Sequence, residues 1–140
     1  MCNNFNISIQ LEGQDKLLSL VSGMYHLDIK DNFRLSVLGI TNDGFLVIYD
    51  DNGADLVSNG SYLYNVKRRV KLSSISNVLN EKVYCKQETY YPYRLNVISK
   101  TNEDSFVFYF NKNEIPHMEK LISLLRKNKV KVSKRNVSLE

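Results

Sequence analysis

The chain has 140 residues and a mass of 16.2 kDa, which is the size of a single domain that can bury a core without disulfides or metals. Hydrophobic residues make up 43% and charged residues 24%, as in ordinary globular proteins, so the composition excludes a disordered tail, a fibrous repeat and an enzyme with a cleft between two domains. The net charge of +4 is unevenly spread: residues 1–65 carry 3 basic and 8 acidic side chains (net −5), and residues 66–140 carry 16 and 7 (net +9). Either the two halves attract each other within one fold, which is the interpretation we prefer, or the basic half meets an acidic partner.

The cysteines and the apolar runs bear on the compartment. Cys2 and Cys85 are the two cysteines, and their spacing fits neither a metal site nor a redox pair, as in proteins of a reducing interior. No window reaches the roughly 18 consecutive apolar residues of a membrane span, and Met1–Phe5 lacks the features of a signal peptide. We therefore expect a soluble, cytoplasmic protein and leave peripheral membrane contact open.

Seven strands are expected from the apolar runs and the turns between them. Tyr, Phe, Val and Ile are abundant and alanine occurs once, which favours strands over helices. Asn42-Asp43-Gly44 is a strong hairpin signal, because glycine accepts a positive φ at little cost. The predicted strands cover residues 23–29, 33–41, 44–49, 62–72, 76–90, 93–100 and 105–110.

The pattern within these strands predicts how they are covered. Phe45–Tyr49 and Phe106–Phe110 are continuous apolar runs, which suit strands that are covered on both faces. In the fourth strand the alternation puts one set of residues on the buried face, with a bulge or bend expected at Arg68, where the apolar phase breaks. That buried set is Tyr62, Tyr64, Val66, Val70 and Leu72.

A helix is expected from Glu114 to about Lys127, with Asn113 as its N-cap and Pro116 tolerated in its first turn. Its apolar stripe consists of Ile115, Met118, Leu121, Ile122 and Leu125. We expect Leu121, Ile122 and Leu125 to be buried against Val70, Leu72 and the Phe106–Phe110 strand.

The two ends of the chain are expected to lie outside the domain proper. Residues 1–12 are expected to be an N-terminal extension, with a short additional strand as one interpretation, and residues 13–127 to be the domain. Asp15–Val21 is either a helical turn or, as we prefer, the start of the first strand. Residues 128–140 form a basic C-terminal tail, and the pattern leaves open whether it adds a strand.

Three segments in order resemble a known group of domains. They are Gly13-Gln14-Asp15-Lys16-Leu17-Leu18 followed by Gly23-Met24-Tyr25, then Leu38-Gly39-Ile40-Thr41-Asn42-Asp43-Gly44-Phe45-Leu46, and Val70-Lys71-Leu72-Ser73-Ser74-Ile75-Ser76-Asn77-Val78. Together with the order of strands and helix, they look like a bacterial pleckstrin-homology-like (PH-like) or GRAM-like domain over residues 13–126. The resemblance implies a mainly β (α+β) fold, a PH-like barrel of seven antiparallel strands capped by one C-terminal helix. The group is functionally mixed, so the fold does not name a ligand.

Catalytic and metal motifs are not found. The two histidines, His26 and His117, have no nucleophile motif beside them, and His117 is expected to be a solvated helix residue. Asp50–Asp55 lacks the alternating ligands and the terminal glutamate of a calcium loop. We expect a protein that is not an enzyme and that uses no cofactor and no metal.

The basic side chains are the candidate site. Lys67, Arg69 and Lys71 share one face of the fourth strand and Arg68 flanks them, so together they can address an anionic surface; the alternative is a solvated face that prevents edge pairing. A second basic cluster runs from the end of the helix into the tail. Its tail members are Lys129, Lys131, Lys134 and Arg135.

The loop end of the barrel, where related domains bind phosphoinositides, has the opposite charge. Residues 30–32, 50–60 and 100–104 carry 2 basic and 6 acidic side chains (net −4), so a phosphoinositide headgroup is disfavoured there.

Three functions remain. The first, which we favour, is a non-enzymatic PH-like binding module for protein–protein docking or weak peripheral association with anionic surfaces, its partner a protein or a second copy. A peptide would use the groove between the helix and the fifth strand, by strand addition or helix packing. The second is a small β-barrel holding an apolar ligand among its aromatic residues. The third is a basic nucleic-acid-binding domain with stacking tyrosines (Tyr62, Tyr64, Tyr90, Tyr91, Tyr93), which we do not expect because the alternation buries Tyr62 and Tyr64.

Overall fold

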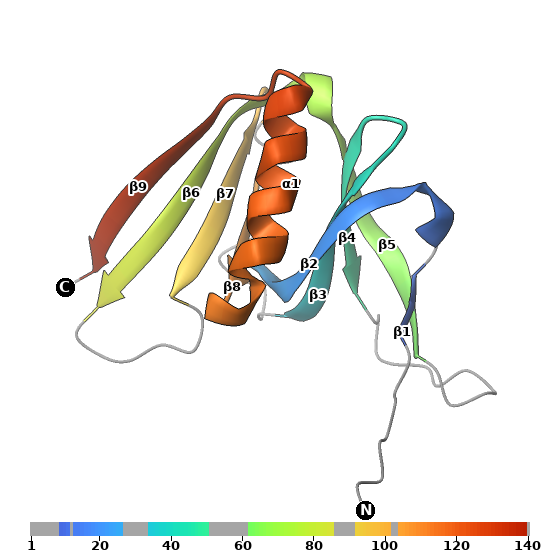
Figure 1. Cartoon of the computed structure of the whole chain (residues 1–140), viewed down its shortest axis with the longest axis horizontal. Helices are drawn as coiled ribbons and strands as arrows, with labels where there is room; N and C mark the ends of the chain where they lie inside the picture. Colours follow the sequence, from blue (N-terminus) through green and yellow to red (C-terminus); the bar gives the residue numbers. More distant parts are fainter. Residues whose placement is uncertain are drawn as a thin grey trace, which may run out of the picture.

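The computed structural model describes residues 9–11, 13–26, 34–50, 62–85, 92–101 and 104–139. In these residues a single strongly bent sheet wraps around one helix (Figure 1). No helix in this part of the chain is long and apolar enough to cross a membrane. The strands are β1 (Ile9–Leu11), β2 (Leu17–His26), β3 (Arg34–Thr41), β4 (Phe45–Asp50), β5 (Tyr62–Lys71), β6 (Ile75–Cys85), β7 (Tyr93–Ser99), β8 (Phe106–Phe110) and β9 (Val132–Leu139), and the helix is α1 (Ile115–Lys127). Short 3-10 turns cover Gln14–Lys16, Leu72–Ser74 and Lys112–Glu114.

The expected seven antiparallel strands are present as β2 to β8, in the order β5-β4-β3-β2-β8-β7-β6. Two further strands extend the sheet, β1 beside β5 and β9 beside β6, and both pair in parallel. The expectation of a wholly antiparallel, seven-stranded barrel is therefore corrected at its two edges. The first strand begins at Leu17, six residues earlier than the predicted start at residue 23; in Asp15–Val21 the helical turn is correct for Asp15 and Lys16, and the preferred strand is correct from Leu17 onward. Residues 27–29 and 86–90, included in two predicted strands, lie outside the described part.

The parallel direction of β9 follows from the path of the chain. Helix α1 returns the chain to the end of the sheet where β6 begins, so β9 starts beside β6 and runs the same way (Figure 1). The buried side chain of Val130 and a hydrogen bond from Val78 N to Lys131 O (2.8 Å) fix this return. Of the two interpretations of residues 128–140, the added strand is correct for Val132–Leu139.

Two glycines allow the bends of the sheet. Gly44 closes the β3–β4 hairpin at φ 88°, at the predicted Asp-Gly turn. Gly23 lies where β2, paired with β3 along its length, begins to pair with β8. A Cβ atom on Gly23 would lie 2.1 Å from Tyr109 O, so only glycine permits this close approach.

The main core lies between the bent sheet and α1. Met118, Leu121, Ile122 and Leu125 are buried in one cluster that also contains Val70, Leu72, Phe106, Phe108 and Phe110, so the predicted stripe is buried in the same core as these residues. The predicted N-cap is wrong: a 3-10 turn over Lys112–Glu114 precedes the helix, and the Asn111 side chain accepts a hydrogen bond from Asn113 N (3.0 Å). Glu114 then anchors the start of α1 to β2 by accepting a hydrogen bond from Ser22 N (2.7 Å).

Strand β5 contains the expected bulge, one residue before the predicted position. Arg68 pairs with Ile48 and Val66 with Tyr49, so Lys67 is the extra residue. The bulge reverses the face of the strand. Val70 belongs to the main core, whereas Tyr64 and Val66 pack on the opposite face of the sheet with Val37, Val47 and Tyr49. The prediction that Tyr64 and Val66 share a face with Val70 is therefore wrong, because the alternation does not continue through a bulge.

Candidate binding groove beside the helix

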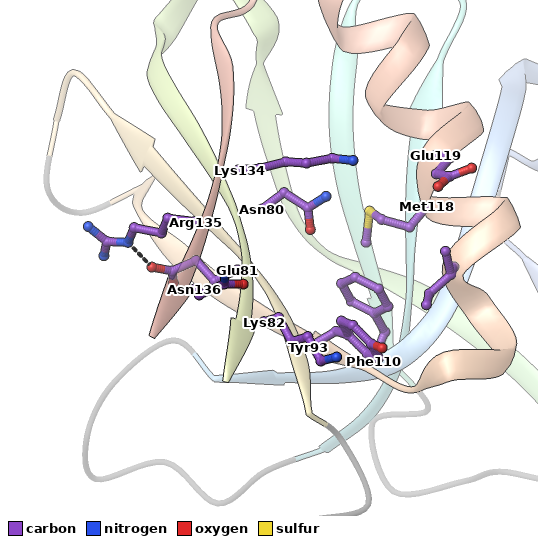
Figure 2. Close-up of a pocket in the computed structure, with 11 residues that line it drawn as sticks. Asn80, Glu81, Lys82, Tyr93, Phe110, Met118, Glu119, Lys134, Arg135 and Asn136 are labelled. Carbon is purple, nitrogen blue, oxygen red and sulfur yellow. Dashed lines mark hydrogen bonds and ion pairs between the residues drawn. The ribbon is translucent and has the colours of Figure 1, made fainter. Parts of the chain in front are cut away.

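A pocket of about 400 Å³ lies between α1 and the strands at the β9 end of the sheet (Figure 2). We call it the α1–β9 groove. Five elements contribute to it: three consecutive strands, the helix and the strand that follows the helix. Its lining residues are Asn80, Glu81 and Lys82 of β6, Tyr93 of β7, Phe110 of β8, Ile115, Met118 and Glu119 of α1, and Lys134, Arg135 and Asn136 of β9.

The floor of the groove is apolar. The rings of Tyr93 and Phe110 are stacked, with their centroids 5.6 Å apart and their planes at 22°. Ile115 and Met118 come from the helix; Met118 and Phe110 are almost fully buried, so the half-buried Tyr93 and Ile115 supply the accessible part of the floor. Such a floor gains free energy by removing an apolar side chain from water.

The rim of the groove is polar and carries more positive than negative side chains. Asn80 pairs with Lys134 and Lys82 with Asn136, so these four side chains lie on the face of the sheet that is turned toward the helix. Figure 2 shows Lys134 extending from β9 toward the α1 side. The Lys82 ammonium lies 5.0 Å from the Tyr84 ring centroid and 5.8 Å from that of Tyr93. The rim therefore presents two ammonium groups, with Glu119 opposite them on the helix.

The outer wall of the groove is fixed by a buried carboxylate. Glu81 alternates with Asn80 and Lys82, so its side chain lies on the other face of the sheet, with 0% exposure. Arg94 Nε of β7 donates to Glu81 Oε1 (2.7 Å), and Arg135 Nε of β9 donates to Glu81 Oε2 (Figure 2). Two charge-assisted hydrogen bonds thus join β9, β6 and β7 across the strands.

The predicted basic residues of β5 are interrupted by the bulge. Lys67, Arg69 and Lys71 are all exposed, but Lys67 is the bulged residue. The Arg69 guanidinium lies 5.2 Å from the Phe45 ring centroid, and Arg68 is turned to the other side, where it forms an ion pair with Asp104 (3.5 Å). Lys67, Arg69 and Lys71 remain exposed to an anionic partner, but Arg68 is not on their side, and the bulge interrupts the regular spacing that the sequence implied.

The basic residues of the tail are divided between the faces of β9. Lys129 and Lys131 are exposed before the strand begins, Lys134 lines the groove, and Arg135 is on the outer face with Glu81. Strands β5 and β9 lie near opposite ends of the strand order, on either side of α1 in Figure 1. Lys134 and Arg135 therefore do not combine with Lys67, Arg69 and Lys71 into one surface.

The ion pairs within the described part of the chain each join residues of the same half, such as Lys16 with Asp43 (4.0 Å) and Arg68 with Asp104. One attraction between the halves is seen in the charges around Asp43, because, in addition to the hydrogen bond from Thr41, Arg69 of the basic half helps to lower the pKa of this carboxyl of the acidic half.

The acidic loop end is largely outside the described residues, which omit 30–32, 51–60, 102 and 103. One of its counted acids is not at the surface: Asp50 is fully buried and accepts a hydrogen bond from the Tyr25 hydroxyl (2.7 Å). Asp104 pairs with Arg68, and the Lys100 ammonium donates to Ser73 O (3.0 Å). Of the counted acids that are described, Asp104 thus has a cation beside it that the count did not include.

The aromatic side chains bear on the two alternative functions, an apolar-ligand barrel and a nucleic-acid-binding domain. Tyr25, Phe106, Phe108 and Phe110 are packed in the main core, so these four aromatic side chains fill the interior of the bent sheet. The stacking tyrosines of a nucleic-acid site are dispersed: Tyr64 packs on the outer face of β5 and Tyr93 in the groove, and the side chains of Tyr62, Tyr90 and Tyr91 lie outside the description.

His117 is exposed and pairs with Glu114 (3.4 Å), and the side chain of His26 is not described. Over the described residues no three His, Cys, Asp or Glu side chains are grouped for a metal.

The groove expected between the helix and the fifth predicted strand, which is β6 in the structure, exists. The edge of β6, where a peptide strand was expected to add, is already occupied by β9. Strand β9 pairs with β6 from Val78 to Cys85, so strand addition to β6 is blocked by the chain itself while β9 is in place. The contributions of β7, β8 and β9 to this groove were not predicted, because its lining comes from five elements. The available signal was the Val130–Val132 spacing after the helix, which fits a returning strand.

The fold of the chain is similar to part of a solved structure. No protein-family model and no curated protein matches the chain. Among solved structures, the chain is similar to Vav1 in a structure described as "Vav1 inhibited by an allosteric inhibitor: Vav1 inhibitors block GEF activity". The superposition has a TM-score of 0.57 at 15% identity and covers 89% of this chain and 22% of the Vav1 chain, which contains a PH domain. The fold is PH-like. The likeness concerns the fold alone, and the chain corresponds to about a fifth of the Vav1 chain.

Proposed function

We propose that this protein is a non-enzymatic PH-like binding module that docks a segment of another protein in the α1–β9 groove. The observation that carries the proposal is the groove itself: an apolar floor of Tyr93, Phe110, Ile115 and Met118 under a polar rim. Concave sites with an apolar base and a few placed polar groups are the usual form of ligand sites. Kinship with bacterial PH-like or GRAM-like domains and residence in the cytoplasm are parts of this proposal that come from the sequence.

The groove fits a protein segment better than the other partners considered. Its volume of about 400 Å³ is near the lower end of the ~300–1,000 Å³ range of ligand pockets, enough for a side chain or two of a docked chain. A flat bilayer cannot reach a floor that is recessed between a helix and a strand. Strand pairing at β6 is already satisfied by β9, so the docked segment would make side-chain contacts in the groove.

The test is selection from a random-peptide display library on the full chain, followed by binding of the enriched peptides to two variants. Asn136→Trp places an indole on the exposed inner face of β9, inside the groove. Ser138→Trp is the matched control, because Ser138 is also exposed on that face but does not line the groove. We expect Asn136→Trp to weaken binding at least tenfold and Ser138→Trp to leave it within twofold. Absence of any enriched peptide, or equal binding by both variants, would refute the docking site.

A second candidate is weak peripheral association with anionic surfaces through Lys67, Arg69 and Lys71, whose side chains are exposed. Such contact is salt-sensitive, because screening at ~0.15 M shortens the field to about 8 Å. The test is co-sedimentation with phosphatidylserine vesicles at low and physiological salt, comparing wild type with a Lys67→Glu, Arg69→Glu, Lys71→Glu variant. Equal sedimentation of the two proteins would remove this surface from consideration.

A further inference from the structure

We infer that the segment docked in the α1–β9 groove is acidic and inserts one aromatic or large apolar side chain between α1 and β9. The inference rests on the proposed docking function and adds the chemistry of the partner. It follows from three features of the described residues: the charge of the rim, the composition of the floor and the position of Glu81.

The rim attracts anions. The Lys82 and Lys134 side chains lie on the same inner face of β6 and β9. They are offset by two residues along the strands, because Lys134 pairs with Asn80 and Lys82 pairs with Asn136. Within the described part of the chain neither ammonium forms an ion pair with a carboxylate. Glu119 is the acid that faces them, so the two cations exceed the local negative charge. Carboxylates of a docked segment would supply the missing partners.

The carboxylate of Glu81 does not cancel this charge. It is held on the opposite face of the sheet between Arg94 and Arg135, and those two guanidinium groups more than balance it. Among the described residues, the charged side chains on the inner face of the groove are therefore the two lysines and Glu119.

The floor selects the anchoring side chain. Phe110 and Met118 are almost fully buried, so the accessible apolar surface comes from the half-buried Tyr93, whose ring is backed by that of Phe110, and from Ile115; an aromatic or long apolar group can pack on them better than a small polar one. Burial of one such side chain contributes the apolar part of the affinity, and the lysines set the charge preference.

A second copy of the chain that pairs through the edge of β9 is disfavoured. The outer edge of β9 ends the strand order, but an antiparallel pairing of two β9 strands would put the Lys134-Arg135 segment of one copy near that of the other. Like charges across a strand pair are destabilising, and edge lysines are a common means of preventing such pairing. An acidic segment meets no such repulsion.

The experiment is a parallel selection from a random-peptide display library on three full-length proteins: wild type, a Lys82→Glu, Lys134→Glu variant and a Lys131→Glu control. Lys131 is exposed and lies just before β9, outside the groove. We expect the wild-type and control pools to be enriched in an aromatic or large apolar residue flanked by Asp and Glu. The double variant should lose this acidic enrichment, and its dissociation constant for a wild-type-selected peptide should rise at least tenfold. Circular dichroism verifies that each variant is folded.

The outcomes separate the inference from the function on which it rests. A wild-type pool that is neutral or basic, yet loses binding in Asn136→Trp, would overturn the acidic partner and leave the docking function standing. The same acidic enrichment on the double variant would also overturn it, because the lysines would then not set the preference. If no pool is enriched on wild type, the docking function itself fails.

Discussion

Glu81 provides a direct test of how β9 is held in the sheet. In the Glu81→Gln variant the side-chain shape is kept but the charge that pairs with Arg94 and Arg135 is removed. Removing one partner of a buried ion pair typically costs about 3–5 kcal/mol, because it leaves an uncompensated charge. The two arginine side chains are 20% and 53% exposed, so water partly solvates them and we expect the lower end, about 3 kcal/mol. For a domain of this size that corresponds to a fall in Tm of roughly 10 °C.

The assay is thermal and urea denaturation followed by far-ultraviolet circular dichroism, with Arg135→Gln and the double variant completing a cycle. Arg135→Gln alone should cost about 1 kcal/mol, since its side chain is half exposed. The cycle should give a coupling energy of about 1–2 kcal/mol. Hydrogen exchange should also accelerate at the amides of β9 more than at those of β3. If Glu81→Gln melts within 1 °C of wild type, with unchanged exchange in β9, the buried carboxylate does not hold the strand.

Three further predictions concern the core, a close contact and a titration. Leu125→Ala should destabilise the fold by roughly 2–5 kcal/mol in urea denaturation, because it leaves a cavity under α1; an unchanged midpoint would mean that the helix does not cap the core. Gly23→Ala should cost roughly 3 kcal/mol, since its Cβ would lie 2.1 Å from Tyr109 O and the backbone of β2 or β8 must move; a variant as stable as wild type would contradict this contact. The Thr41 hydroxyl donates a hydrogen bond to Asp43 and is the main reason that the pKa of this carboxyl is lowered. A lowered folded-state pKa stabilises the fold above the unfolded pKa, and this contribution is lost as pH falls through the folded value. NMR titration of Thr41→Val should therefore show a raised pKa for Asp43, and an unchanged pKa would assign the shift to another group.

Local sequence patterns predicted the elements that depend on neighbouring residues. The helix at Ile115–Lys127 has its buried stripe where the three-to-four spacing put it, because helix periodicity fixes one face whatever that face contacts. The β3–β4 hairpin follows from the conformational freedom of Gly44. The run Phe45–Tyr49 is covered on both faces, with Leu46 and Ile48 in the main core and Val47 and Tyr49 in the outer cluster.

The candidate site was predicted less well, because single-strand alternation is a local rule. It put Lys67, Arg69 and Lys71 on one face, and one extra residue at the bulge was enough to break the phase and to move Tyr64 and Val66 to the other side. The basic tail was treated as a charge cluster, and its residues instead separate into the groove, the outer face and the connection before β9.

By itself, the sequence determined the mainly β class, the seven central strands and the capping helix, since each is encoded by periodicity and turn residues within a short window. Tertiary structure alone decided that β9 covers the edge of β6 in parallel, that Glu81 is buried between two arginines, and that Lys82 and Lys134 flank an apolar floor. The physical reason is that these features depend on pairings between segments about 50 residues apart, such as Glu81 with Arg135. The free energy of such a pairing depends on which strand edge remains open after the rest of the sheet has formed, and no local pattern contains that information.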